Sequence, residues 1–339
     1  MRVKDKALLL VITLAVILLC IPAVYAKSQK KAQKTPPVSI RTVQKEAADG
    51  VKTFSTIQEA INSITDASAS NRYIIKITPG AYNEAVTMKE YADIEGSGQD
   101  NTIITSSAPV TLSAANNTKI KNMKIINTAP DAGDNEEGTA VLFKGVTAKA
   151  DSVSVESQGT ASRSVIKITA FSNIELNNVS VRSENSSPDK DNKGIAVGGR
   201  AVISNLRAIV SGGSWATAVA VQHGGEIDMR NSSIESSDAA YTDAVDVCCR
   251  DSKVIIKGSK IIASNGIGET IGIYSPKGTI VTNSEIRARS NTGNITGARG
   301  LTIKNSIIEG RVLNSKLINC RDEKNKPIST SKPKKATKK

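Results

Sequence analysis

A short phrase of alternating apolar and polar residues, interrupted by a single asparagine, recurs along most of the sequence. Clear copies occupy residues 174–181, 227–234 and 303–308. Consecutive interruptions lie 22 to 29 residues apart. A repeat of this length indicates a solenoid, a propeller or an array. The residues at the interruptions are Asn122, Asp151, Asn178, Asn205, Asn231, Gly258, Asn283 and Asn305.

The spacing of two between apolar residues predicts strands instead of helices. Each repeat has room for about three strands of roughly five residues with their turns, which is fewer than the four strands of a propeller blade. We therefore predict an all-β chain, folded as a single-stranded right-handed parallel β-helix with one coil per repeat. Because coils stack about 4.8 Å apart, the asparagines are expected to form a column. Their amides can hydrogen-bond along it, and asparagine tolerates left-handed backbone.

A second alternating strand precedes each asparagine phrase. Two positions of every such strand are predicted to point into the core, whereas the outward positions vary freely. All twelve inward residues are apolar, namely Val141, Ile166, Ile195, Val219, Val245, Ile271, Phe143, Ile168, Val197, Val221, Val247 and Ile273.

Residues 53–64 predict a helix at the beginning of the solenoid. Ser55, followed three residues later by Gln58, forms a capping-box pattern. Such a helix would cover the open apolar end of the first coil. Its apolar stripe consists of Ile57, Ala60, Ile61 and Ile64.

The formal charge of +13 resides at the two ends of the chain. Residues 1–34 hold seven basic residues and one acid, and residues 324–339 hold seven basic residues and no acid, which leaves 31 of each kind between them. A neutral body lacks the basic stripe of a nucleic-acid-binding fold, so we expect no nucleic-acid partner. We predict that residues 321–339 form a basic, disordered tail that contacts wall polymer, lipid headgroups or another anionic cell surface.

Residues 1–26 have the features of a secretory signal peptide. A basic start precedes an apolar run over residues 7–21 and a small-residue cleavage site that ends at Ala26. An uncleaved anchor is the alternative. We predict a linker over residues 27–37 and the β-helix domain over residues 38–320. The protein would be secreted, to the periplasm, the extracellular space or the cell surface.

Three cysteines follow the predicted signal peptide, too few for a disulfide framework. The adjacent Cys248 and Cys249 are expected on opposite faces of a strand, one as a core thiol and one as a surface thiol. Cys320 is the third. No His/Cys cluster has the spacing of metal ligands, so we expect neither a metal nor a cofactor.

Three phrases occur in a fixed order near the N-terminus. They are Phe-Ser-Thr-Ile-Gln-Glu-Ala-Ile at 54–61, Ile-Thr-Pro-Gly-Ala-Tyr-Asn-Glu-Ala-Val at 77–86 and Ile-Glu-Gly-Ser-Gly-Gln-Asp-Asn-Thr-Ile-Ile at 94–104. Over residues 38–105 this order resembles the opening of the pectinesterase family. The resemblance implies a right-handed parallel β-helix, export, and metal-free hydrolysis of methyl esters on polygalacturonate.

The resemblance also implies a catalytic site on the outer face of one strand column. Its parts are a nucleophilic aspartate, an acid/base aspartate, glutamines that hold the oxyanion and an arginine. The first glutamine phrase of the family falls on Thr139, which lacks the amide. The second keeps Gln158 but has Gly159 in place of aspartate, and the third, at 193–198, again lacks the aspartate. We therefore expect the family mechanism to be absent.

Other polar residues offer a replacement site on the same outward face. Gln222 is predicted to lie one coil from Asp246, with further candidates close by. Two carboxylates can cleave an ester when one attacks and the other exchanges a proton. The alternative is that these are solvated strand and turn residues. The candidate catalytic residues are Gln158, Gln222, His223, Asp243, Asp246 and Arg250.

These observations favour a non-catalytic, exported protein that binds polysaccharide or another surface partner along its coil faces. One alternative is a carbohydrate esterase of the pectinesterase type, which modifies the cell wall, or a polysaccharide lyase with a non-standard site. A purely structural array is the other.

Overall fold

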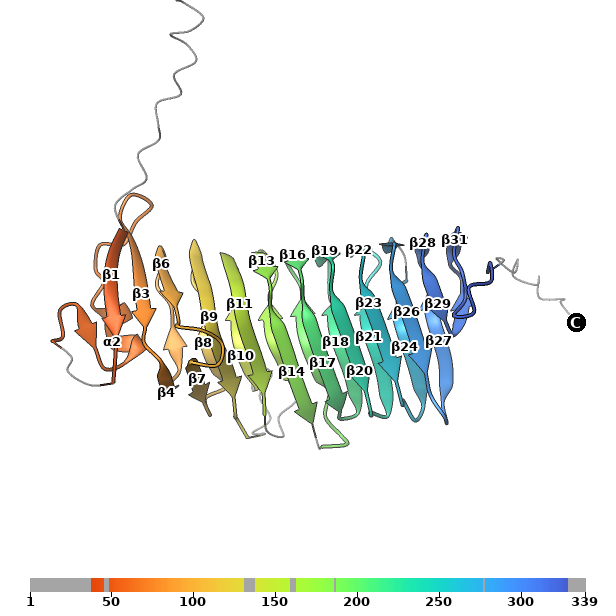
Figure 1. The fold of residues 1–339 in the computed structure, drawn as a ribbon, viewed down its shortest axis with the longest axis horizontal. Coiled ribbons are helices and arrows are strands. Elements are labelled where there is room, and N and C mark those ends of the chain that lie inside the picture. The colour runs from red at the N-terminus through yellow and green to blue at the C-terminus, as the bar shows by residue number, and fades with distance from the viewer. Residues whose placement is uncertain are drawn as a thin grey trace, which may run out of the picture. The chain divides into compact units, whose positions relative to one another are not determined.

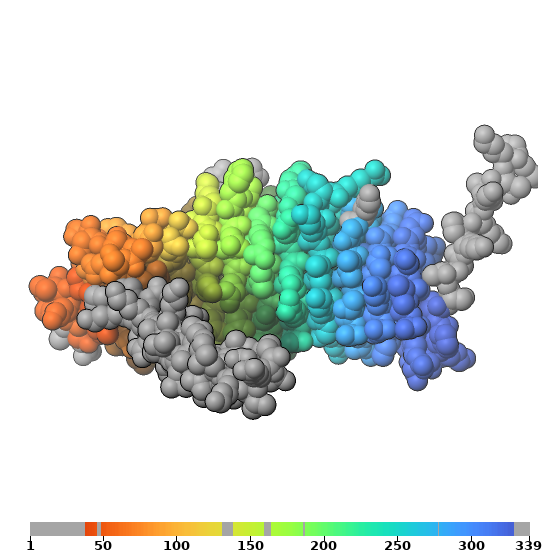
Figure 2. Space-filling view, turned by 90° about the horizontal axis from the view of Figure 1, so that it is seen from above, coloured from red at the N-terminus to blue at the C-terminus, as the bar shows by residue number. Residues whose placement is uncertain are grey.

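The computed structural model describes residues 38–45, 49–130, 138–158, 163–185, 187–276 and 278–328. These residues form a parallel β-helix whose coils follow one another in sequence order (Figures 1 and 2). The predicted signal peptide, the linker and residues 329–339 of the tail lie outside the described residues. Within the described ranges, no helix is long and apolar enough to cross a membrane.

Each coil contributes strands to three rows. The first row is a ten-stranded parallel sheet, which we call the ten-stranded sheet. In spatial order it consists of β5 (Val86–Thr87), β8 (Val110–Ser113), β10 (Thr139–Phe143), β12 (Arg163–Ile168), β15 (Asn192–Val197), β18 (Trp215–Val221), β21 (Tyr241–Val247), β24 (Glu269–Tyr274), β27 (Asn294–Arg299) and β30 (Arg311–Leu313).

The second and third rows share the long strands β9 (Thr118–Asn127) and β11 (Thr147–Ser157), whose two halves pair with different neighbours. The second row otherwise contains β2 (Thr53–Phe54), β1 (Val38–Val43), β3 (Arg72–Ile77), β6 (Ala92–Glu95), β13 (Asn173–Asn177), β16 (Arg200–Ser204), β19 (Glu226–Arg230), β22 (Lys253–Lys257), β25 (Ile280–Thr282), β28 (Thr302–Lys304) and β31 (Lys316–Ile318). The third contains β4 (Gly80–Asn83), β7 (Thr102–Ser106), β14 (Ser180–Asn185), β17 (Arg207–Gly212), β20 (Ser233–Ser237), β23 (Lys260–Ser264), β26 (Glu285–Arg289) and β29 (Ile307–Glu309).

The core runs through the coils as one apolar cluster. Eleven of the twelve predicted inward residues belong to it, which confirms the alternating pattern. Ile271 is the exception, because it is buried outside the core cluster. It pairs with Asp243, and Ile273 pairs with Val245, so the predicted columns are wrong by two residues at this strand. The pairing of β24 skips Gly272, as that of β21 skips Ala244, so Ile271 lies on the outer face instead of pointing inward, which strict alternation does not predict.

The predicted asparagine column is confirmed by the backbone. All six of its asparagines have a positive φ, as does Gly258, and the Asn205 amide donates to Asn178 Oδ1 at 3.1 Å. The left-handed backbone position of this coil is held by Ser152, with a φ of 56°, and not by Asp151. The carboxylate of Asp151 nevertheless joins the hydrogen-bonded column, because it accepts from Asn177 Nδ2 at 3.0 Å and from Asn178 Nδ2 at 3.3 Å.

A buried serine ladder, which the repeat pattern does not predict, runs beside the asparagine column. Ser259 Oγ donates to the carbonyl of Lys257 at 3.0 Å and accepts from the backbone N–H of Ser232 at 3.2 Å. Ser284 repeats this pattern in the next coil. The hydroxyls therefore pair backbone groups that the turn would otherwise leave buried without partners.

The helix α2 (Ile57–Asn62) covers the N-terminal coil, and its four predicted apolar residues are buried. Its capping box lies one residue later than predicted, with Thr56 as the N-cap and Glu59 as its partner. The carboxylate of Glu84 accepts from the N–H groups of Ile57 and Gln58, both at 2.9 Å. These bonds satisfy first-turn donors that an isolated helix leaves unpaired.

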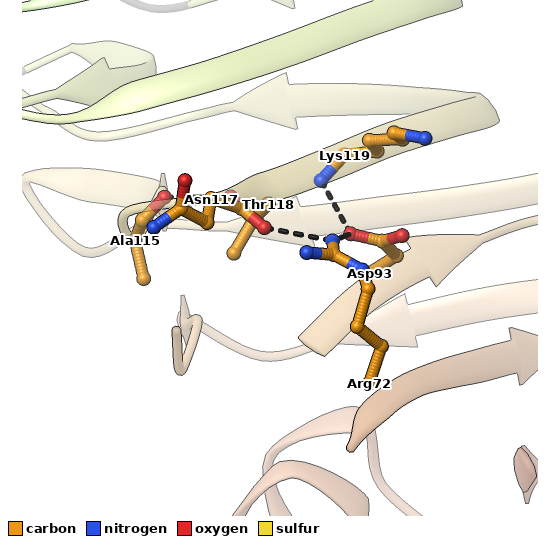
Figure 3. A network of polar contacts seen from close by, with 6 residues as sticks. All are labelled: Arg72, Asp93, Ala115, Asn117, Thr118 and Lys119. Carbon is orange, nitrogen blue, oxygen red and sulfur yellow. Dashed lines mark hydrogen bonds and ion pairs between the residues drawn. The ribbon is translucent and has the colours of Figure 1, made fainter. Parts of the chain in front are cut away.

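A polar network joins three consecutive coils near the same end (Figure 3). Asp93 Oδ1 in β6 accepts from Arg72 Nη2 in β3 at 2.8 Å and from the backbone N–H of Lys119 in β9 at 2.9 Å. Arg72 Nη2 also donates to the carbonyl of Asn117 at 2.8 Å. The network therefore holds the register of the first coils through side chains as well as through the backbone.

Candidate functional site

Ionisable and aromatic side chains gather on the outer face of the ten-stranded sheet between β15 and β27. The strand register places them in two columns. The first column contains Lys193, Thr217, Asp243 and Ile271. The second contains Ala196, Ala220, Asp246, Tyr274 and Arg299.

Asp243 and Asp246 share this face although they are three residues apart on one strand. In a regular strand, such residues point to opposite faces. In β21, however, Ala244 has no register partner in either neighbouring strand, so the regular pairing is interrupted at this residue. Val245 belongs to the core cluster. So does Ala216, which is the register partner of Thr242 in the preceding coil, so Thr242 also faces inward. Asp243 and Asp246, each one residue further along, therefore both face outward.

The surroundings of the two carboxyl groups shift their proton affinity in the same direction. Asp243 is only 4% exposed, and burial, with the nearby charges of Asp246 and Glu269, raises its pKa to about 8. Burial also raises the pKa of Asp246, while the positive charge of Lys193 opposes that rise. Asp243 therefore carries a proton at neutral pH.

A protonated carboxyl beside a second carboxyl group gives the site a proton donor and a proton acceptor. This is the combination that general acid–base catalysis uses. It also provides both kinds of hydrogen-bonding group for a polar ligand. Lys193 adds a cation at the same place, and its Nζ is 2.9 Å from Asp191.

An exposed aromatic pair lies at the beginning of the same strands. The rings of Trp215 in β18 and Tyr241 in β21 stack with their centroids 4.6 Å apart and their planes at 19°. They are 39% and 40% exposed. In the next coil, Gly268 lies against the ring of Tyr241, because a Cβ at this position would lie 3.0 Å from a ring carbon. The pair thus presents flat aromatic surface to solvent.

Further candidates lie on the turns that follow these strands. Gln222 comes directly after β18 and is level with Cys248, so it lies diagonally from Asp246. Cys249 Sγ is 3.8 Å from His223 Nδ1. Cys248 and Cys249 are joined by a disulfide, so the expected core thiol and surface thiol are wrong. Both residues lie beyond Val247, where β21 has ended and strand alternation no longer applies.

The structure therefore brings some of the predicted site residues together and separates others. Asp243 and Asp246 share one face, with Gln222, His223 and Arg250 on the adjoining turns. Gln158 lies at the end of β11, three coils before β21 in the stack, and its amide donates to Glu156 at 3.3 Å. Among the described residues, no group of three or more His, Cys, Asp or Glu side chains has an arrangement suited to a metal ion.

Sequence reasoning missed the aromatic pair and Lys193. Trp215 and Tyr241 stand 26 residues apart, which is one repeat. Aligning the repeats on their first strand places the two rings in one column. The signal was therefore present, but only two coils carry it.

Comparison with known proteins supports the fold. Residues 44–177 match the family model described as Pectinesterase, and the sequence matches no curated protein. The pectate lyase Pel9A is similar in structure, with a TM-score of 0.55, 10% identity, and coverage of 87% of this chain and 79% of that one.

Several pectin methylesterases are also similar in structure, and two of them serve as examples. The enzyme from carrot has a TM-score of 0.43 and 15% identity, over 89% of this chain and 91% of that one. PemA from Erwinia chrysanthemi has a TM-score of 0.40 and 14% identity, over 86% and 92%.

The family match includes the three N-terminal phrases that resemble pectinesterases, and it ends before the strands that carry Asp243 and Asp246. It therefore supports the resemblance and assigns no role to the two aspartates. The chain is a right-handed parallel β-helix protein whose residues 44–177 match the pectinesterase family.

Proposed function

We propose that the protein is exported and binds polysaccharide on the outer face of the ten-stranded sheet. The observation that carries this proposal is the exposed Trp215–Tyr241 stack beside Asp243 and Asp246. A sugar ring has an apolar face and a polar rim. The aromatic pair suits the apolar face, and the carboxyl groups suit the hydroxyls. A few fixed polar groups beside apolar surface are typical of a binding site.

The protonation of Asp243 favours a polysaccharide over a cationic partner. A pKa of about 8 leaves this carboxyl neutral at pH 7, so it donates a hydrogen bond that a hydroxyl or carbonyl oxygen accepts. Asp246 accepts from hydroxyl groups, and Lys193 donates beside it. Together these residues match the donors and acceptors that surround a sugar ring. The family match over residues 44–177 also supports a carbohydrate ligand.

The binding test uses Trp215→Ala, with Phe171→Ala as the matched control. Phe171 is 97% exposed and lies on a turn outside the aromatic pair. We expect Trp215→Ala to weaken binding to a panel of plant and bacterial polysaccharides by about fivefold, because stacked aromatic contacts contribute about 1 kcal/mol beyond their buried area. Trp215→Phe should restore most of the affinity. Equal affinity of Trp215→Ala and Phe171→Ala would contradict the proposal.

Ester hydrolysis is the second candidate function, and the raised pKa of Asp243 favours it. In that reaction a carboxylate oxygen of Asp246 attacks the ester carbonyl carbon. The bond to the methoxy oxygen then breaks, and Asp243 gives that oxygen its proton, which releases methanol. Water hydrolyses the acyl intermediate and returns a proton to Asp243. No specific observation favours the lyase alternative.

Methanol release from methyl-esterified pectin distinguishes binding from hydrolysis. Release by the wild-type protein that Asp246→Asn abolishes would establish the second candidate. Asp228→Asn is the control, because Asp228 lies in β19 and pairs with Arg230 at 2.6 Å. Polysaccharide binding without methanol release would leave binding as the function.

A further inference from the structure

A cationic hollow lies beside the second column of the outer face, on the turns that follow β21, β24 and β27. Its volume is about 500 Å³, which is within the range of about 300–1,000 Å³ typical of small-molecule sites. Three of its lining residues are basic, namely Arg250, Arg299 and Lys316, and none is acidic. Tyr274 contributes an aromatic wall.

The three basic residues come from three different coils. Arg250 follows β21, Arg299 ends β27 and Lys316 begins β31, and all three are exposed. None of them has an ion-pair partner among the residues that the structure describes. Elsewhere on the surface, Lys253 pairs with Glu226 at 2.7 Å and Arg289 with Glu309 at 2.6 Å. The hollow therefore concentrates positive charge that the described protein does not neutralise.

Arg299 is held in place by an aromatic ring. Its guanidinium carbon lies 5.4 Å from the ring centroid of Tyr274, and the two residues are register partners on adjacent strands. A cation–π contact uses the face of the guanidinium. Its N–H groups remain able to donate to an anion in the fork geometry that suits oxyanions.

We propose that this hollow binds a tetrahedral oxyanion, a phosphate or sulfate group. Such a group presents three or more acceptor oxygens in different directions, so donors from three coils can each reach one. A carboxylate presents only two oxygens in one plane. The charge of the three cations also exceeds what one carboxylate neutralises.

The anion is a substituent of the bound polysaccharide. Tyr274 is level with Asp246, so the hollow adjoins the surface assigned to sugar binding and a chain on that surface reaches it. This step rests on the proposed function. The oxyanion site itself does not, because free phosphate tests it alone.

The first experiment measures binding of inorganic phosphate and sulfate by calorimetry. We expect Arg299→Gln and the double variant Arg250→Gln/Lys316→Gln each to weaken binding by about tenfold or more, because charge-assisted hydrogen bonds are lost. The matched control is Lys257→Gln/Lys260→Gln, which removes the same charge from the end of β22 and the start of β23, outside the lining of the hollow. An equal loss in this control, or acetate binding as tightly as phosphate, would overturn the oxyanion site.

The second experiment compares one polysaccharide with and without phosphate or sulfate esters. We expect the esters to raise affinity by about tenfold in the wild-type protein and to have little effect in Arg299→Gln. Equal affinity for both polymers would overturn the substituent and leave a free anion as the ligand. If Trp215→Ala binds the unsubstituted polymer normally while phosphate binding persists, the proposed function fails and the oxyanion site stands.

Discussion

The buried carboxyl of Asp243 should make the stability of this protein fall as pH rises from 4 to 8. Its pKa is about 8 in the folded protein, against 3.8 for the free group. Between these values the folded chain keeps a proton that the unfolded chain has released. Stability rises with pH only where the unfolded state binds more protons. Here the folded state binds more, so the contribution of this group is complete below pH 3.8 and is lost as pH rises towards 8.

The size of the effect follows from the width of this window. A shift of about four pKa units, at roughly 1.4 kcal/mol each, corresponds to about 6 kcal/mol over the whole range. Between pH 5 and pH 7 alone, the free energy of unfolding should fall by about 3 kcal/mol because of this residue. Asp243→Asn keeps the shape of the side chain and removes its titration. The variant should therefore lose this part of the pH dependence and be more stable than the wild type at pH 8.

Urea unfolding at pH 5, 6, 7 and 8 measures the effect. The chain contains a single tryptophan, Trp215, which lies near Asp243 on the strand register and reports unfolding by its fluorescence. Asp228→Asn is the control, because Arg230 lowers the pKa of Asp228 and its loss should leave the wild-type slope between pH 5 and pH 7 unchanged. Parallel curves for the wild type and Asp243→Asn across this range would refute the reasoning.

Two further predictions concern the turns. Ser259→Ala should reduce the free energy of unfolding by about 1–3 kcal/mol, because it leaves the buried N–H of Ser232 without its acceptor. Ser233→Ala, at the exposed first residue of β20 in the preceding coil, should change it little in the same urea titration. Without reductant, none of Cys248, Cys249 and Cys320 should react with a labelling reagent in the folded protein, because Cys248 and Cys249 are joined and Cys320 is buried. Mild reductant should expose two thiols by mass spectrometry, and a modified Cys320 in the folded state would contradict the burial.

The fold could be predicted from the sequence because two independent periods agree. Alternation with a period of two fixes which side chains face the core, and the spacing of the asparagines fixes the length of one coil. Both depend on local backbone rules that hold at every repeat. Eleven core residues and the left-handed asparagines therefore lie where the pattern puts them.

The errors occurred where the pattern fits two registers equally well. Ile271 and Ile273 are both apolar and two residues apart, so the sequence does not reveal that only Ile273 enters the core while Ile271 lies on the outer face. Ser55 and Thr56 are both good N-caps, and the contacts from Glu84 to the first helical turn begin at Ile57. Long-range hydrogen bonds of this kind decide between neighbouring residues, and one sequence does not contain them.

The candidate site depends on an irregularity that a regular strand would not allow. With strict alternation, Asp243 and Asp246 would face opposite ways, and one carboxyl group would enter the apolar core at a high cost. The interruption at Ala244 lets both face outward while Thr242 and Val245 remain buried. Burial is the largest cause that raises the pKa of each carboxyl group. The same local change in register therefore places the two carboxyl groups together and gives Asp243 its proton at neutral pH.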